Sequence, residues 1–245
     1  MRKEQNLNKK LQNIILAISI LIPSVFYVSG IKSVFGQGSF MYSVMWGLIN
    51  YLFMMTAADF ISKFKNISKL PGLKIRKRTY YISIFVYIGF LIFVNIYFLQ
   101  QLYFRNVDII NTLASPIIIV GLFLLFLFNL QNGKFLIKDE KETDIYEIPK
   151  KHSFRNGNDV LGNVVGSYEN GLVLGNYYFP YEGMKSISKS KENEVIIKGK
   201  DGSKNYIVKV GSKNSENQLI SEIKDALEKG KIEEKKVNLK KLKNL

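Results

Sequence analysis

Four long apolar stretches in the first 130 residues limit what this chain can fold into more than any other feature. They cover residues 11–30, 40–61, 80–99 and 109–130. Each approaches or exceeds the ~20 residues that a helix needs to cross a hydrocarbon core of roughly 30 Å. The first stretch follows a basic N-terminus, as in a signal peptide, but no convincing small-residue cleavage site follows it. The sequence therefore predicts a transmembrane domain of four helices over residues 1–130.

Charge divides the chain into two unlike parts. Residues 1–130 contain three acids and 13 bases, whereas residues 131–245 contain 17 acids and 22 bases. The mean hydropathy of +0.02 averages over this difference and hides it. We therefore expect a membrane domain followed by a soluble domain.

The bases in the connections between the apolar stretches predict the orientation of the helices. Four bases precede the first stretch and seven lie in the loop over residues 62–79, whereas the other two loops carry only Lys32 and Arg105. Loops rich in Lys and Arg stay on the cytoplasmic side. Frequent Lys, Ile and Asn are also typical of AT-rich bacterial genomes. We expect a multi-pass protein of the bacterial inner membrane with both termini in the cytoplasm.

Polar residues within the apolar stretches are the first candidates for a functional site. Asp59 is the only acid in them, and with Asn50 and Asn95 it forms a possible intramembrane polar site for a proton or cation. A structural interpretation competes with this one. Asp59 lies four residues before Lys63, a spacing that favours an ion pair on a helix, and asparagines commonly hydrogen-bond between membrane helices. We favour the structural interpretation.

After residue 130 the apolar runs become short and alternate with polar residues, which is the pattern of β-strands. Turn signals separate several of these runs, and Asp201-Gly202 marks the strongest hairpin. The sequence predicts strands over residues 134–139, 143–148, 163–168, 171–174, 177–180, 185–188, 195–198 and 205–210.

One amphipathic helix follows the predicted strands. Ser215 and Gln218 have the spacing of a capping box at its start, and Gly230 is placed as its C-terminal stop. Leu219, Ile223 and Leu227 recur at helical spacing, so we expect this face to pack on the sheet.

The order of these elements resembles the bacterial pleckstrin-homology-like (PH-like) domains that are appended to membrane helices. The resembling features cover roughly a quarter of the chain: Gly171-Leu172 opening a strand, the aromatic stretch 177–181 leading into Met184-Lys185-Ser186-Ile187, the Asp-Gly hairpin and the last helix. We therefore expect an α+β membrane protein, in which a four-helix transmembrane bundle precedes a cytoplasmic antiparallel β domain over residues 131–230 with a C-terminal helix. The resemblance implies a binding or scaffolding role and no catalytic residues.

The residue inventory excludes several kinds of chemistry. The chain has no Cys, which removes thiolate metal sites, cysteine nucleophiles and disulfides. Its one histidine, His152, lies in a basic segment typical of a solvated loop. No phosphate-binding loop, zinc-protease motif or nucleophile elbow is present. The sequence therefore predicts no catalytic residues, no metal site, no cofactor and no enzymatic activity.

Two basic segments predict contact with the membrane surface. Bases beside a cytoplasmic leaflet attract anionic lipid headgroups, and neither segment carries the interleaved aromatics that single-stranded nucleic acid would stack on. The tail over residues 231–245 has an incomplete apolar face, so a surface-bound helix and a disordered Lys-rich end both stay open. The bases are Lys74, Arg76, Lys77 and Arg78 in the loop, and Lys235, Lys236, Lys240 and Lys241 in the tail.

Two classes of function fit these patterns. The first is a non-enzymatic membrane protein whose cytoplasmic domain binds a lipid or a protein partner, such as another membrane protein, as a scaffold, regulator or immunity-type factor. The alternative is a small transporter or transporter subunit that uses the polar residues of the apolar stretches.

The predicted orientation is testable with reporter fusions. A fusion at Asn132 should report the cytoplasm, and one inserted within residues 36–39 should report the opposite side, because the loops on the two sides differ strongly in positive charge. Reporter signals from the same side at both positions would contradict the model of four spans.

Overall fold

A computed structural model describes residues 8–29, 39–104, 107–113, 136–140, 143–148, 164–190 and 194–238, with single positions between 117 and 124. These residues fall into two compact units. The helical unit draws on residues 5–62 and 82–130, and the β unit draws on Lys63–Tyr81 and Gln131–Leu245. The loop between the second and third long helices thus belongs to the β unit.

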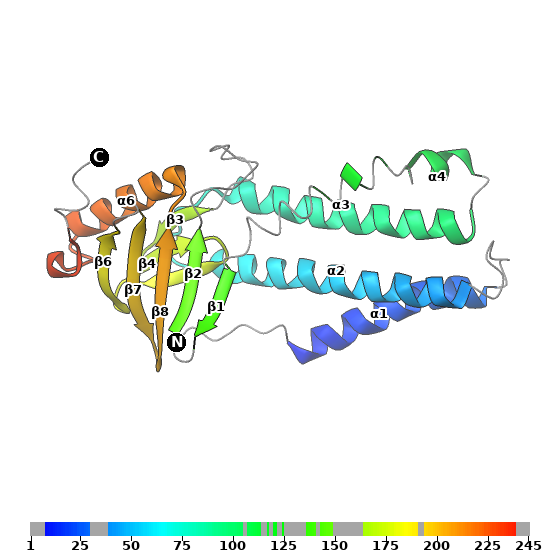
Figure 1. Cartoon of the computed structure of the whole chain (residues 1–245), viewed down its shortest axis with the longest axis horizontal. Coiled ribbons are helices and arrows are strands. Elements are labelled where there is room, and N and C mark those ends of the chain that lie inside the picture. Colours follow the sequence, from blue (N-terminus) through cyan, green and yellow to red (C-terminus); the bar gives the residue numbers. More distant parts are fainter. Residues whose placement is uncertain are drawn as a thin grey trace. The chain divides into compact units, whose positions relative to one another are not determined.

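Three helices are long and apolar enough to cross a membrane, and they confirm three of the four predicted stretches (Figure 1). They are α1 (Lys9–Val28), α2 (Ser39–Ile67) and α3 (Lys77–Leu102). The short helix α4 (Asp108–Leu113) begins at the fourth predicted stretch. Most of that stretch lies outside the described residues.

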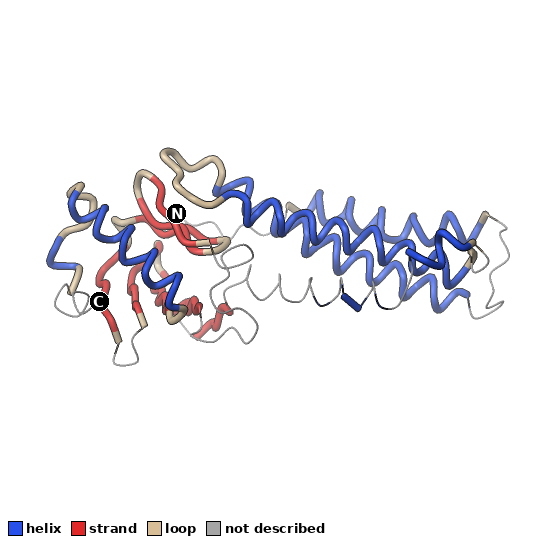
Figure 2. Tube along the Cα trace, turned by 90° about the horizontal axis from the view of Figure 1, so that it is seen from above, coloured by secondary structure: helices blue, strands red, loops and turns tan. Residues whose placement is uncertain are grey.

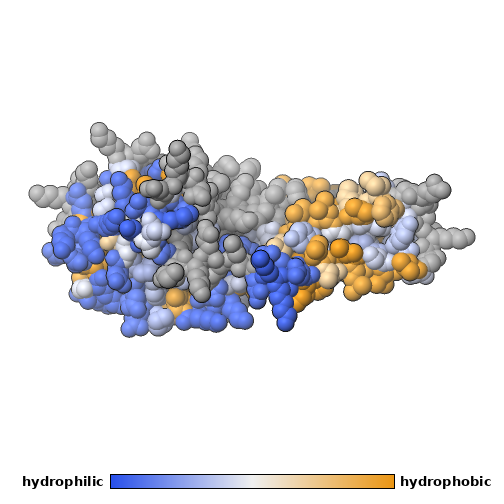
Figure 3. All heavy atoms as spheres, turned by 90° about the horizontal axis from the view of Figure 1, so that it is seen from below, coloured by the Kyte–Doolittle hydropathy of each residue, from blue (hydrophilic) through white to orange (hydrophobic). Residues whose placement is uncertain are grey.

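Helices α2 and α3 bury residues at spacings of three, four and seven, so each helix has an inward face. Apolar side chains also cover the outward faces, where Phe85 is 77% exposed. Figure 3 shows these apolar residues gathered over the helices. Such an outward face fits a lipid environment, in which the exterior of a helix bundle is as apolar as its interior. The buried residues include Trp46, Asn50, Ala57, Phe60, Phe64 and Ile67 on α2, and Tyr80, Tyr87, Phe90, Val94, Phe98 and Leu102 on α3.

All eight predicted strands are present in the β unit, three of them with the predicted ends and the others with ends that shift by at most three residues. They form a five-stranded sheet in the order β1-β2-β8-β7-β6 and a three-stranded sheet in the order β3-β4-β5. Their bounds are β1 Leu136–Glu140, β2 Thr143–Ile148, β3 Val165–Tyr168, β4 Gly171–Leu174, β5 Tyr177–Pro180, β6 Met184–Lys189, β7 Val195–Asp201 and β8 Lys204–Val210.

The five-stranded sheet is mixed, and the prediction of a purely antiparallel domain was wrong. Strand β2 pairs in parallel with β8, from Thr143↔Asn205 to Ile148↔Val210. Hairpin signals report only on strands that are neighbours in the sequence. Strands β3 to β7 lie between β2 and β8 in the sequence. No local sequence pattern could therefore specify that β2 pairs with β8.

Helix α6 (Lys213–Glu228) packs its apolar face on the strands, as predicted (Figure 2). Leu219 and Ile223 are buried in the core of the β unit, and Leu227 packs partly against it. The predicted capping box was wrong, because Ser212 is the N-cap and Ser215 lies buried inside the first turn. The stop at Gly230 is confirmed by a positive φ of 66° just beyond the helix.

The core of the β unit continues beyond the predicted boundary at residue 230. Ile232 and Val237 are 4% and 6% exposed and belong to the same hydrophobic cluster as the strands. A short 3₁₀ turn, η2 (Glu234–Lys236), separates them. Val237 then forms a parallel bridge with Ile187 at the edge of β6. The first part of the predicted tail is therefore built into the β unit, while Lys240 and Lys241 lie outside the described residues.

Candidate functional site

A search for catalytic arrangements gives nothing among the described residues. They contain no group of three or more His, Asp or Glu side chains that could hold a metal ion, and His152 lies outside them. Burial raises the pKa of Tyr168 and of Tyr181 to about 12, so both hydroxyls stay protonated near neutral pH. Two polar features remain: a network between α2 and α3, and the loop that joins these helices.

Asn50 and Asn95 join α2 to α3 by a reciprocal pair of hydrogen bonds. The side-chain amide of each donates to the carbonyl oxygen of the other, at 3.0 and 2.9 Å. The indole Nε1 of Trp46 also donates to Asn95 Oδ1 at 2.8 Å. Asn95 Nδ2 donates in addition to the Leu91 carbonyl at 2.8 Å. The amide of Asn95 is thus fully used within the protein, which fits packing better than a substrate site.

Asp59 is not part of this network. It lies nine residues after Asn50 on the same helix, a separation of about 13 Å along the helix axis. The structure therefore brings together two of the three residues of the predicted intramembrane polar site. The ring of Trp46, which donates to Asn95, also stacks on Phe98 at a centroid distance of 5.7 Å.

The docked loop, which we define as residues 63–81, is the second feature, and its backbone joins the three-stranded sheet. The Lys74 amide donates to the Ser167 carbonyl at 2.7 Å, and the Ser167 amide donates back to the Lys74 carbonyl at 3.1 Å. The Glu169 amide donates to the Pro71 carbonyl at 2.9 Å. The docked loop thus pairs with the edge of β3 by an antiparallel bridge.

Aromatic side chains anchor both ends of the docked loop. Phe64, near the end of α2, stacks on Tyr80 of α3 at a centroid distance of 4.5 Å. Tyr80 is 2% exposed, and its hydroxyl donates to the Gly175 carbonyl after β4. The ammonium of Lys63 lies 5.5 Å from the centre of the Tyr177 ring on β5, within the range of a cation–π contact.

Gly166 on β3 permits the close approach of the docked loop. A Cβ at this position would lie 2.2 Å from the Lys74 carbonyl oxygen and 2.7 Å from Ile75 Cγ2. Backbone atoms cannot yield to such an overlap without moving the loop away from the strand. Any side chain at residue 166 therefore opposes docking.

Six bases on the docked loop are exposed, and no acid occurs between residues 63 and 81. Lys77 and Arg78 lie in the first turn of α3, where the helix dipole disfavours positive charge. Helix stability thus gives no reason for their position, whereas an anionic surface does. The exposed bases are Lys65, Lys69, Lys74, Arg76, Lys77 and Arg78.

Of the four predicted tail bases, the two that the structure describes, Lys235 and Lys236, lie beside the five-stranded sheet and are paired. Lys235 and Lys236 bond to Glu233 at 2.6 and 3.4 Å, and the hydrogen bond to Glu233 raises the pKa of Lys235. This turn sits beside β6, whereas the docked loop sits beside β3. The structure therefore does not merge the two predicted basic segments into one surface.

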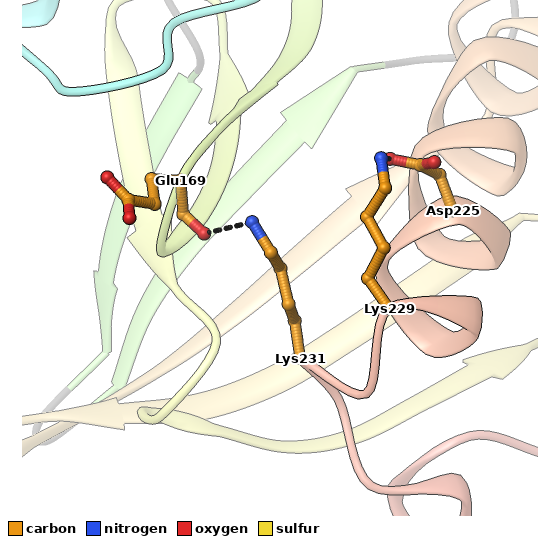
Figure 4. Close-up of polar contacts among 4 residues, drawn as sticks. All are labelled: Glu169, Asp225, Lys229 and Lys231. Carbon is orange, nitrogen blue, oxygen red and sulfur yellow. Dashed lines mark hydrogen bonds and ion pairs between the residues drawn. The ribbon is translucent and has the colours of Figure 1, made fainter.

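Two further lysines lie near the docked loop, and sequence reasoning missed their role. Lys231 Nζ donates to the Glu169 carbonyl at 2.7 Å, and Lys229 pairs with Asp225 at 2.6 Å (Figure 4). The pKa of Asp225 is lowered by the hydrogen bond from Lys229 and by the positive charges of Lys229, Lys74 and Lys231. The end of α6 and the docked loop thus meet at the β3–β4 turn. Such contacts between distant segments leave no local pattern.

Comparison of the chain with protein-family models, with curated proteins and with solved structures finds no match. The function must therefore be argued from the geometry alone. The network of Asn50 and Asn95 serves the packing of α2 on α3. The docked loop presents exposed positive charge on a fixed backbone, which makes it the candidate functional site.

The role of Asn95 in packing is testable by replacing it with Leu. The change leaves the Trp46 indole and the Asn50 amide without their partner, and we expect a loss of about 1–2 kcal/mol in helix-unit stability. Unfolding of the full chain in mixed micelles measures this loss. A double-mutant cycle with Asn50→Leu should show that the two losses are not additive. Additive losses would contradict a direct bond between the two amides.

Proposed function

We propose that this chain is a non-enzymatic protein of the bacterial inner membrane whose β unit is a cytoplasmic domain. In this proposal the domain binds anionic lipid headgroups through the docked loop and acts as a scaffold or regulator at the membrane surface. Three helices with the length and composition of membrane spans support the location. The uneven distribution of loop bases supports the orientation.

The observation that carries the proposal is the exposed basic surface of the docked loop. A loop that only connected two spans would not need the bridge to Ser167, which fixes the backbone that carries these six exposed bases. Because α2 and α3 continue directly into this loop, its bases emerge beside the membrane. Each base near an anionic leaflet contributes about 1 kcal/mol to binding.

Lipid fits this surface better than nucleic acid does. Recognition of single strands relies on aromatic rings that stack on bases. The aromatic residues of the docked loop, Phe64, Tyr80 and Tyr81, pack on each other at 4.5 and 5.5 Å. Phe64 and Tyr80 are also buried. Headgroups require only positive charge near the surface.

We retain a PH-like relationship as part of the proposal. Two sheets closed by a C-terminal helix support it. The parallel pairing of β2 with β8 departs from the antiparallel pattern of that family. The lipid-binding proposal rests on the docked loop and not on this relationship.

Native mass spectrometry of the full chain in detergent tests the proposal. The chain should retain phosphatidylglycerol in preference to phosphatidylcholine. In the variant Lys74→Gln/Arg76→Gln/Lys77→Gln/Arg78→Gln this preference should fall at least about tenfold. Each base contributes about 1 kcal/mol to binding, and a loss of ~1.4 kcal/mol already corresponds to a factor of ten.

A matched variant controls for the loss of four charges. Lys185, Lys198, Lys200 and Lys224 are exposed bases on β6, β7 and α6, outside the docked loop. Their joint replacement by Gln should leave the preference for phosphatidylglycerol unchanged. Equal retention of both lipids by the natural chain, or an equal loss in the two variants, would overturn the proposal.

A further inference from the structure

We propose that docking of the loop on β3 and binding of anionic headgroups stabilise each other, so that the β unit responds to the charge of the membrane. This inference rests on the proposed function and adds to it a conformational consequence. The ligand class is the anionic phosphate of a lipid headgroup. The responding element is the contact between the docked loop and the β3–β4 hairpin.

The two events use different groups of the same segment, so they can occur together. Docking engages the backbone amide and carbonyl of Lys74 and the backbone carbonyl of Pro71. Headgroup binding would engage side chains, and those of Lys74, Arg76, Lys77 and Arg78 are exposed while the backbone is docked. The backbone groups that dock the loop are therefore different from the side-chain groups that would meet a headgroup.

Docking also arranges the bases before a ligand arrives. The connection between Ile67 at the end of α2 and Lys77 at the start of α3 is held at Pro71 and at Lys74. A ligand that binds an ordered segment avoids the entropic cost of ordering it. Coupling between two binding events is reciprocal, so a bound headgroup must favour docking by the same free energy.

The contact between the docked loop and the β3–β4 hairpin involves specific groups of the strands and turns, so a change in docking would also affect this hairpin. Gly166 leaves room for the Lys74 carbonyl, and the Gly175 carbonyl accepts from Tyr80. The Glu169 carbonyl accepts from Lys231, beyond the end of α6. The β3–β4 hairpin is thus held by the docked loop on one side and by the chain after α6 on the other.

Hydrogen exchange of the full chain in nanodiscs tests the coupling. The reporters are the amides of Lys74, Ser167 and Glu169, which donate the hydrogen bonds of the contact. We expect nanodiscs rich in phosphatidylglycerol to slow their exchange at least about fivefold relative to nanodiscs of phosphatidylcholine. A difference of that size corresponds to roughly 1 kcal/mol of coupling, the low end of the usual range.

Two variants separate headgroup binding from docking of the loop. Arg76→Gln/Lys77→Gln/Arg78→Gln changes only exposed side chains, so it should keep the protection seen in phosphatidylcholine and lose the response to phosphatidylglycerol. Gly166→Ala should exchange fast in both lipids, because its Cβ overlaps the Lys74 carbonyl. Gly89→Ala is the matched control, since a Cβ there meets nothing within 4 Å.

The outcomes distinguish this inference from the proposed function. If native mass spectrometry shows preferential retention of phosphatidylglycerol but exchange is the same in both nanodiscs, the coupling is wrong and the lipid site stands. If the triple Gln variant responds to phosphatidylglycerol as the natural chain does, the coupling is also wrong. If the natural chain shows no lipid preference at all, the proposed function falls and the coupling falls with it.

Discussion

The structure depends on the backbone contact between the docked loop and the β3–β4 hairpin, in which Lys74 and Ser167 exchange two hydrogen bonds and the Glu169 amide donates to the Pro71 carbonyl. Without it the connection between α2 and α3 would be a plain tether. With it, residues 63–81 become part of the β unit. Phe64 and Tyr80, at the two ends of this loop, stack on each other, and both are buried. The β unit is thus discontinuous in sequence, because it combines residues 63–81 with residues 131–245.

The same helix pair is joined a second time within the helical unit. Asn50, Asn95 and Trp46 make hydrogen bonds that are costly to leave unmade in lipid. Helices α2 and α3 are therefore joined by polar bonds in the helical unit, while the loop that connects them pairs with β3 in the β unit. This arrangement favours a structural role for the asparagines and leaves the exposed bases of the docked loop as the surface available to a ligand.

Local patterns predicted the parts of the fold that depend on neighbours in the sequence. Three apolar helices, the eight strands, and the inward placement of Leu219 and Ile223 follow from periodicity and turn residues. The parallel pairing of β2 with β8 and the bridge of Lys74 to Ser167 do not, since each joins segments tens of residues apart. The capping box failed because the helix begins three residues earlier than predicted, with Ser212 as its N-cap. Gln218 bonds to the Val165 carbonyl on β3 at 2.6 Å, a tertiary partner that its spacing from Ser215 does not reveal.

The central claim, that the docked loop belongs to the β unit, is most directly tested by an engineered disulfide. The chain has no Cys, so two introduced cysteines can form only one intramolecular bond. A Cβ on Gly72 would lie 3.4 Å from the Cβ of Glu169, close to the 3.5–4.5 Å typical of disulfides. In membranes under mild oxidation, Gly72→Cys/Glu169→Cys should cross-link readily. Gly202→Cys/Glu169→Cys should not, because a Cβ on Gly202, which also has a positive φ, meets nothing within 4 Å. Mass spectrometry of the linked peptides measures both yields, and equally low cross-linking in the two pairs would contradict the account.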